Sequence, residues 1–335
     1  MKLTPQKILI VRLSAIGDII LTTPLVRAVR TRFPKAEIHF LTKKGTVCLL
    51  ENNPAINKVI PFDSKTTSLK DLIAETKAEN YDWIIDIHKN LRSRMLRWFG
   101  GAKLTTTYNK SYVRRMVLLY FRIRSAKPIV PVIDKYFQAV SKFGIENDNK
   151  GTEVFFTKSD QQKVDSIFKK EDEKKLVTIC PGASFTTKQW KLSGFEEVGR
   201  YYVKKGCQVV FLGGPTDIEV CETLAKKVDG ISVAGKLKLL ESAALLKQSD
   251  VAITNDSGML HLAQSQQTPI VAIYGPTTKD WGFFPVPEKS RVVEHEGLNC
   301  RPCHSKGSDN CPKRHFKCMN EIGSSSVINA VNELV

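Results

Sequence analysis

Short apolar runs rich in β-branched residues alternate with longer polar-apolar stretches along almost the whole chain. Each run has the length of a strand buried on both faces, and in each longer stretch the apolar residues recur with helical spacing. Strands and helices in this order form parallel sheets covered by helices, so we expect an α/β fold. The predicted strands cover residues 7–11, 37–41, 56–62, 82–87, 104–108, 154–157, 176–180, 208–212, 231–233, 251–254 and 270–274.

The first helical stretch ends at Phe33 and contains Pro24. Pro24 either lies in the first turn of a helix capped by Thr23, or kinks a helix that begins near Asp18. The remaining predicted helices cover residues 69–79, 111–124, 134–143, 159–170, 194–205, 218–228, 240–248 and 259–267.

The strand and helix series occurs twice, which predicts two doubly wound domains in this chain of 335 residues. The charged run EDEKK at residues 171–175 resembles a solvated linker. We therefore expect one domain at residues 1–170 and another at residues 171–335, with a ligand cleft between them.

The stretch from Val251 to Pro276 predicts strand, turn, helix and strand. In such units ligands bind beyond the carboxyl ends of the strands, and a helix N-terminus favours an anion. The backbone N–H groups of Ser257 and Gly258 are therefore candidates for an anion site, with Asp256 and His261 at the same end. The alternative is that Asp256 only caps the helix and His261 only packs inside it.

Two further loops follow predicted strands of the second half. The loop from Pro181 to Trp190 offers Ser184 and Lys188, hydroxyl and ammonium groups that suit a diphosphate, although an exposed surface loop has the same composition. Asp217 ends the sequence GGPTD, where an acidic residue either holds a ribose or caps the next helix.

The first half carries a candidate general base, Asp18, just beyond the first strand and close to Arg12. Its alternative role is a helix cap. His88 follows another strand at the same edge, where a structural histidine is the competing interpretation. The segment after it contains cations that either form a solvated helix face or bind an anionic acceptor, namely Lys89, Arg92, Arg94 and Arg97.

The chain is strongly basic: it has 51 Lys and Arg residues but only 34 Asp and Glu residues, which gives a net charge of +17. This balance indicates nucleic acid, an anionic membrane surface or a phosphorylated substrate. No helix-turn-helix, zinc-finger or aromatic-interleaved basic pattern supports nucleic acid, so none is expected as a partner. No stretch has the pattern of a membrane span or signal peptide, and we expect a cytoplasmic protein.

Four cysteines cluster near the C-terminus, at positions 300, 303, 311 and 318, with His304 and His315 between them. Zinc binding, free thiols and labile disulfides remain open for this cluster, and we assign no metal. The four cysteines elsewhere fit small core residues.

Several blocks together resemble the ADP-heptose:lipopolysaccharide heptosyltransferases of glycosyltransferase family 9. They are KILIVRLSAIGDIILTTPLVRAVR, YDWIIDIH, PGASFTTKQWKLSGFEEVGRYY, VVFLGGPTD, ITNDSGMLHLAQSQQTPIVAIYGPT and the cysteine-rich tail. The resemblance implies a GT-B fold of two Rossmann-like domains, the first binding the acceptor and the second the nucleotide sugar. It also implies inverting heptose transfer to the inner core of lipopolysaccharide, with no catalytic metal and no cofactor besides the ADP-heptose substrate.

By the same resemblance, Asp18 is the base, and the donor is bound by Ser184, Lys188, Asp217, Asp256, Ser257, Gly258 and His261. We expect acceptor contacts from Arg12, Lys89, Arg92 and Arg94, and some relatives have lysine or a neutral residue at the position of Arg12. The acceptor is then an anionic glycolipid at the inner face of the cytoplasmic membrane, with which the protein associates peripherally. Transfer of another nucleotide sugar and a GT-B-like epimerase reaction are the alternative functions.

Overall fold

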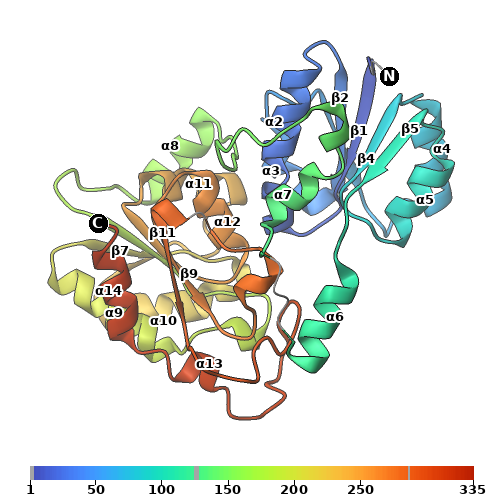
Figure 1. Ribbon diagram of the computed structural model, residues 1–335. Helices are drawn as coiled ribbons and strands as arrows, with labels where there is room; N and C mark the ends of the chain where they lie inside the picture. The colour runs from blue at the N-terminus through green and yellow to red at the C-terminus, as the bar shows by residue number, and fades with distance from the viewer. Residues whose placement is uncertain (1–3, 124–127, 286) are drawn as a thin grey trace. The chain divides into compact units, whose positions relative to one another are not determined.

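The computed structural model describes residues 4–123, 128–285 and 287–335, and it contains two separate parallel sheets (Figure 1). The first sheet has the strand order β3-β2-β1-β4-β5. Its central strand β1 is flanked on both sides, so that Ile10 lies opposite Phe40 of β2 and Ile85 of β4. The strands are β1 (Lys7–Val11), β2 (Glu37–Lys43), β3 (Lys58–Phe62), β4 (Trp83–Asp86) and β5 (Leu104–Thr107).

The second sheet has six strands in the order β11-β10-β9-β6-β7-β8. Strand order reverses between β6 and β9 here, and between β1 and β4 in the first sheet. At such a reversal the loops beyond the carboxyl ends diverge and leave room for a ligand. The strands are β6 (Leu176–Cys180), β7 (Gln208–Phe211), β8 (Ile231–Ser232), β9 (Val251–Asn255), β10 (Ile270–Tyr274) and β11 (Ser290–Glu294).

The α-helices cover the sheets in groups. In the second unit α9, α10 and α14 pack near one another, while α11 packs against α8 and α12 (Figure 1). The α-helices are α1 (Ile16–Ile20), α2 (Thr23–Arg32), α3 (Cys48–Glu51), α4 (Leu69–Ala78), α5 (Leu91–Phe99), α6 (Tyr112–Phe121), α7 (Val132–Phe137), α8 (Lys158–Ile167), α9 (Leu192–Lys204), α10 (Ile218–Val228), α11 (Leu239–Gln248), α12 (Gly258–Ser265), α13 (Lys317–Asn320) and α14 (Ser324–Asn332).

Short 3₁₀ turns connect several of these elements. They are η1 (Lys44–Thr46), η2 (Ser141–Phe143), η3 (Thr186–Lys188), η4 (Pro215–Asp217), η5 (Lys279–Trp281) and η6 (Pro287–Lys289). Within the described ranges, every helix is too short or too polar to cross a bilayer.

The chain divides into two compact units. Unit 1 is Met1–Tyr112 with Val130–Phe155, and unit 2 is Val113–Ile129 with Phe156–Val335. The boundary between residues 155 and 156 precedes the expected one between 170 and 171, because α8 packs against α11 of the second unit. The acceptor and donor roles of the two domains stay predictions.

Some sequence-based expectations need correction. Residues 154–157 do not form a strand, since this short apolar run pairs with neither sheet and leads directly into α8. Pro24 lies in the first turn of a helix, α2, as one alternative predicted, but the N-cap of that helix is Thr22 instead of Thr23. A separate short helix, α1, precedes it, so no single helix is kinked. The predicted helix at 134–143 is only a short helix, α7, followed by the turn η2. β11 and α14 were not anticipated.

The core of unit 2 shows how the sequence permits close packing. Trp190 is 1% exposed, and its ring lies so near Gly194 that a Cβ there would be 2.3 Å from a ring carbon. The indole N–H donates to the carbonyl of Ile322 at 3.2 Å. This tryptophan therefore fixes the loop after β6 against both α9 and the C-terminal segment.

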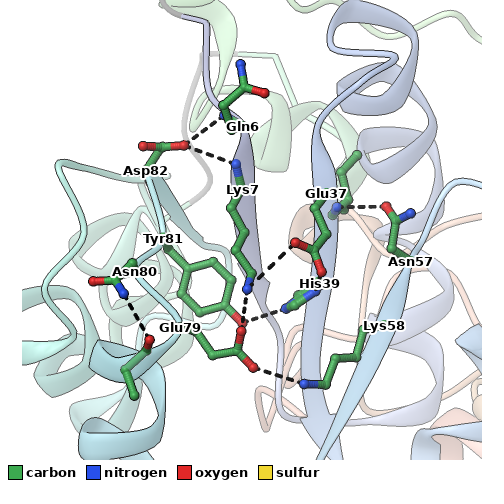
Figure 2. A network of polar contacts seen from close by, with 12 residues as sticks. Gln6, Lys7, Glu37, His39, Asn57, Lys58, Glu79, Asn80, Tyr81 and Asp82 are labelled. Atoms are coloured by element: carbon green, nitrogen blue, oxygen red, sulfur yellow. Dashed lines mark hydrogen bonds and ion pairs between the residues drawn. The ribbon is translucent and has the colours of Figure 1, made fainter.

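A polar network lies at the amino ends of the first sheet's strands (Figure 2). Lys7 contacts Glu79 and, at 3.7 Å, Glu37. His39 bonds the Tyr81 hydroxyl and Glu37, each at 2.7 Å. These groups tie β1, β2 and the segment before β4 together at the edge opposite the candidate site, so we interpret them as structural.

Candidate functional site

Asp18 lies beyond the carboxyl end of β1, where three groups hold its carboxylate. One is the Ala15 N–H, which donates to Oδ2 at 3.3 Å in the capping box of α1, so Asp18 also has the helix-cap role that was its alternative. Arg12 Nη2 is 2.7 Å from Oδ2, and the Tyr136 hydroxyl donates to Oδ1 at 3.3 Å. The guanidinium of Arg12 also donates to the carbonyl oxygens of Ser14 at 2.9 Å and Ile87 at 2.7 Å. Arg12 thus connects the loops after β1 and β4 and sets the orientation of Asp18.

Electrostatics keep this cluster in a defined charge state. Burial lowers the pKa of Arg12, but the neighbouring Tyr136 and Asp18 together raise it by more. The pKa of Arg12 is therefore above its usual value. Burial holds the pKa of Tyr136 well above its usual value, so the phenol remains a neutral donor. Burial and the cations Arg12 and Lys110 lower the pKa of His88 to about 3, so its imidazole is neutral at pH 7.

The predicted acceptor-binding cations lie in different surroundings. Arg12 is 7% exposed and its guanidinium bonds protein groups, which makes it a positioning residue for Asp18. Lys89 Nζ donates to the carbonyl of Tyr108 at 2.9 Å. Arg92 and Arg94 are exposed on α5 and stack over the rings of Phe62 and Trp98. Acceptor contact by these four residues stays a prediction.

In unit 2, Lys188 and Asp256 form an ion pair beyond the neighbouring strands β6 and β9. Lys188 Nζ is 2.6 Å from Asp256 Oδ2, to which the Thr277 hydroxyl also donates at 2.7 Å. Asp256 is not the helix cap, because Ser257 is the N-cap of α12 and its Oγ accepts from the Met259 N–H at 3.3 Å. The carboxylate is therefore available for chemistry rather than committed to the helix end.

Asn255 fixes the loop that carries Lys188. Its Oδ1 accepts from the Trp190 N–H at 3.1 Å, and its Nδ2 donates to the Pro181 carbonyl at 2.7 Å. Because both ends of the loop are held by one side chain of β9, the loop is fixed where the ammonium of Lys188 meets Asp256, the residue before the N-cap of α12.

Asp217 stands at the N-cap position of α10, as the alternative interpretation predicts, but its side chain makes no capping hydrogen bond to that helix. Its carboxylate accepts from the Gly214 N–H at 2.8 Å and closes the turn before α10. A Cβ at Gly182 would lie 2.5 Å from Asp217 Oδ2, so a larger residue there would displace this carboxylate. Contact with a ribose stays a prediction for Asp217.

The remaining donor-site candidates differ in exposure. Ser184 is exposed, Gly258 begins α12, and His261 is 5% exposed with its ring 6.4 Å from that of Phe283. The structure thus groups Lys188, Asp256, Ser257 and Gly258 around one helix N-terminus.

Two residues of these clusters were missed in the sequence. Thr277 follows β10, so the rule that sites lie beyond strand ends could have found it. Tyr136 comes from α7, 118 residues beyond Asp18, and no local pattern marks it.

The cysteine cluster contains free thiols. Cys300 Sγ lies 3.9 Å from His315 Nε2, and burial raises the pKa of Cys318 to about 12. Among the described residues there is no group of three or more His, Cys, Asp or Glu side chains that could hold a metal ion.

Comparison with solved structures shows the fold class. The glycosyl transferase family 9 structure from Veillonella parvula aligns with a TM-score of 0.80 and 25% identity, over 100% of this chain and 98% of that one. The structure of E. coli ADP-heptose lps heptosyltransferase II aligns with a TM-score of 0.75 and 21% identity, over 98% of each chain. The α/β fold is therefore the GT-B architecture of two Rossmann-like units.

The family model described as glycosyltransferase family 9 (heptosyltransferase) matches residues 70–313. The chain belongs to this family and is a glycosyltransferase. Among curated relatives, lipopolysaccharide core heptosyltransferase OpsX of Haemophilus influenzae is 25% identical over 81% of this chain and 79% of its own. Lipopolysaccharide heptosyltransferase 2 of Salmonella typhimurium is 24% identical over 86% of this chain and 88% of its own.

Proposed function

We propose that this glycosyltransferase moves a heptose from ADP-heptose to the inner-core oligosaccharide of lipopolysaccharide, with inversion and without a catalytic metal. Family membership and the names of the relatives support the heptose and the acceptor. Membership in a transferase family also favours transfer over the epimerase alternative.

The observation that carries the proposal is the fixed carboxylate of Asp18. In an inverting displacement, a base takes the proton of the acceptor hydroxyl as its oxygen attacks the anomeric carbon and the diphosphate leaves. Arg12 and Tyr136 hold Asp18 by both oxygens, which orients the carboxylate. A base that is already oriented needs little reorganisation in the transition state.

The departing ADP needs positive charge, and unit 2 offers it without a metal. Lys188 supplies an ammonium, and the N–H groups of Ser257 and Gly258 supply the positive end of α12. On this proposal Ser184 and His261 also line the phosphates, Asp217 contacts the ribose, and Asp256 binds sugar hydroxyls.

The acceptor is an anionic glycolipid presented at the inner face of the cytoplasmic membrane. Lys89, Arg92 and Arg94 are cations near the carboxyl end of β4 that suit its phosphates and carboxylates. The net charge of +17 fits peripheral association with the same membrane.

Another nucleotide sugar is the remaining alternative, since none of these contacts reads the sugar itself. A panel of ADP- and UDP-sugars with one acceptor distinguishes the donors. Turnover restricted to a UDP-sugar would overturn the donor assignment.

The substitution Asp18→Asn tests the base. It keeps the shape of the side chain and removes the proton acceptor, so we expect kcat to fall by about a hundred- to ten-thousand-fold with ADP affinity unchanged. The matched control is Asp148→Asn, which neutralises another carboxylate of unit 1 paired with an arginine, Arg27, at 2.7 Å. Near-normal turnover of Asp18→Asn would exclude Asp18 as the base.

A further inference from the structure

A segment of 47 residues, from Ile87 to Ile133, contains no Asp or Glu. It contains 11 Lys and Arg residues, which is most of the chain's net charge of +17. Elsewhere in the chain cations and carboxylates are interspersed. Two of these cations pair with carboxylates just before the segment, Arg97 with Asp86 at 3.3 Å and Lys103 with Asp82 at 2.7 Å. The other cations have no acidic residue within the segment to compensate their charge.

The same segment holds most of the exposed large apolar side chains. Of 13 such side chains among the described residues, nine lie between residues 91 and 130. They are Leu91, Trp98, Phe99, Tyr112, Val113, Tyr120, Phe121, Ile123 and Val130. Single exposed apolar residues are ordinary, but a concentration of aromatic ones marks an interaction site.

Helix α6 concentrates these features. Tyr112, Met116 and Tyr120 follow one another at four-residue intervals and so share one face of the helix. Tyr112 and Tyr120 are each 68% exposed, whereas Leu118 on another face is 5% exposed. The helix thus turns an aromatic face to solvent.

The opposite side of α6 is attached to unit 2. The Arg115 guanidinium lies 5.8 Å from the centre of the Trp281 ring, and Arg114 donates to the carbonyl of Pro128 at 3.3 Å. Arg122 is exposed beside Phe121, which is 72% exposed. Arg122 therefore places a cation at the C-terminal end of the aromatic face.

We propose that the α6 surface, which comprises Tyr112, Val113, Tyr120, Phe121, Arg122 and Ile123, inserts into the interfacial layer of a bilayer that contains anionic lipids. Tyrosine suits the boundary between headgroups and acyl chains, because its ring is apolar and its hydroxyl stays hydrated. Arginine extends its apolar stem along the same surface and places its charge at the lipid phosphates. Helices with this composition lie in the interface plane.

Charge decides between a membrane and a second copy of this chain. A self-association through the α6 surface would bring two acid-free, basic segments together, and like charges oppose that contact. An anionic bilayer complements both the cations and the aromatic side chains. Helix α5, with Leu91, Trp98 and Phe99 exposed, provides a second element of the same composition.

The inference deepens the proposed function, because an enzyme with a glycolipid acceptor must reach the bilayer. It specifies which residues make that contact, and none of them belongs to the clusters around Asp18 and Lys188. Vesicle binding can therefore be measured without transfer.

The experiment is co-sedimentation of the full chain with vesicles of phosphatidylcholine alone or mixed equally with phosphatidylglycerol. We expect salt-sensitive binding to the anionic vesicles. The variant Tyr112→Ser/Tyr120→Ser/Phe121→Ser should bind them at least about tenfold more weakly, and Arg122→Gln about fivefold more weakly. The matched control Leu192→Ser/Ile231→Ser removes exposed apolar residues elsewhere in unit 2 and should bind as the parent does.

Unchanged vesicle binding by the triple variant, with its melting temperature retained, would overturn the inference. So would sedimentation velocity that shows a dimer dissociated by the triple substitution, which assigns the surface to a second copy. Transfer to a detergent-dispersed acceptor should be the same in the parent and the triple variant. If the parent binds vesicles through α6 but transfers no heptose, the proposed function fails and the membrane surface stands.

Discussion

Removing the hydroxyl of Tyr136 tests whether Asp18 acts as an oriented base. The ring of Tyr136 is 1% exposed and packs edge-on against Tyr108 at 5.2 Å, and phenylalanine preserves both features. Tyr136→Phe therefore deletes one hydrogen bond to Asp18 Oδ1, while the ion pair with Arg12 at 2.7 Å remains. The carboxylate is then held by one oxygen, Oδ2, instead of two.

The size of the effect follows from that bond. A hydrogen bond to a charged group contributes about 1.5–3 kcal/mol, and the 3.3 Å length places this one at the weak end. We expect kcat to fall about tenfold, since about 1.4 kcal/mol corresponds to a factor of ten. The acceptor KM and the ADP affinity should change little, because Tyr136 acts through Asp18.

The assay is initial-rate transfer at saturating donor and acceptor, with ADP affinity by calorimetry. Tyr202→Phe is the matched control: this tyrosine is 4% exposed in unit 2 and donates to Asn332 at 3.0 Å. It should lose stability without a specific loss of kcat. A kcat for Tyr136→Phe within twofold of the parent would refute the orienting role.

Two further predictions concern charge. Lys188→Ala should weaken ADP binding about tenfold or more, as measured by calorimetry. The control is Lys191→Ala, which removes an ammonium that contacts the Asn320 carbonyl and should leave ADP affinity unchanged. Equal ADP affinities of the two variants would count against the phosphate role of Lys188. Hydrogen bonds from Lys7 and Lys58 lower the pKa of Glu79 from 4.5 to about 2, so its stabilisation is present above pH 4.5 and is lost as pH falls toward 2. In urea unfolding Glu79→Gln should cost about 1 kcal/mol at pH 7 and progressively less below pH 4.5, and a constant difference would contradict the linkage.

The parallel core of the fold could be predicted because its strands are buried on both faces. KILIV and IVAIY are continuous apolar runs, and both strands begin and end where the sequence indicates. Residues 154–157 are also a short apolar run, but they do not pair with a strand of either sheet. Edge strand β11 (SRVVE) is half polar, so periodicity did not reveal it. Pairing with β10, a tertiary effect, decides its structure.

The rule that ligands bind beyond the carboxyl ends of parallel strands predicted the charged candidate residues, but it did not predict which side chains they contact. Asp18, Lys188 and Asp256 all lie where strand ends place ligand-binding groups, and Asp256 proved free of the capping role. Tyr136 and the pairing of Lys188 with Asp256 depend on contacts between distant segments. Asp217 shows a different outcome, because its carboxylate bonds the Gly214 N–H of the preceding turn and makes no capping bond to α10.

The Arg12–Asp18 pair of unit 1 and the Lys188–Asp256 pair of unit 2 differ in a way that suits different tasks. Arg12 is buried and bound to two backbone carbonyls besides Asp18, so it cannot move without leaving unsatisfied groups. That pair keeps one carboxylate fixed throughout the reaction. Lys188 belongs to a short loop turn, η3, and is paired with Asp256 across two loops. On the proposed function, the donor diphosphate replaces Asp256 as the partner of Lys188, and the released carboxylate, still bonded by Thr277, turns to the sugar hydroxyls. A permanent pair thus suits the base, and an exchangeable pair suits a substrate that must bind and leave.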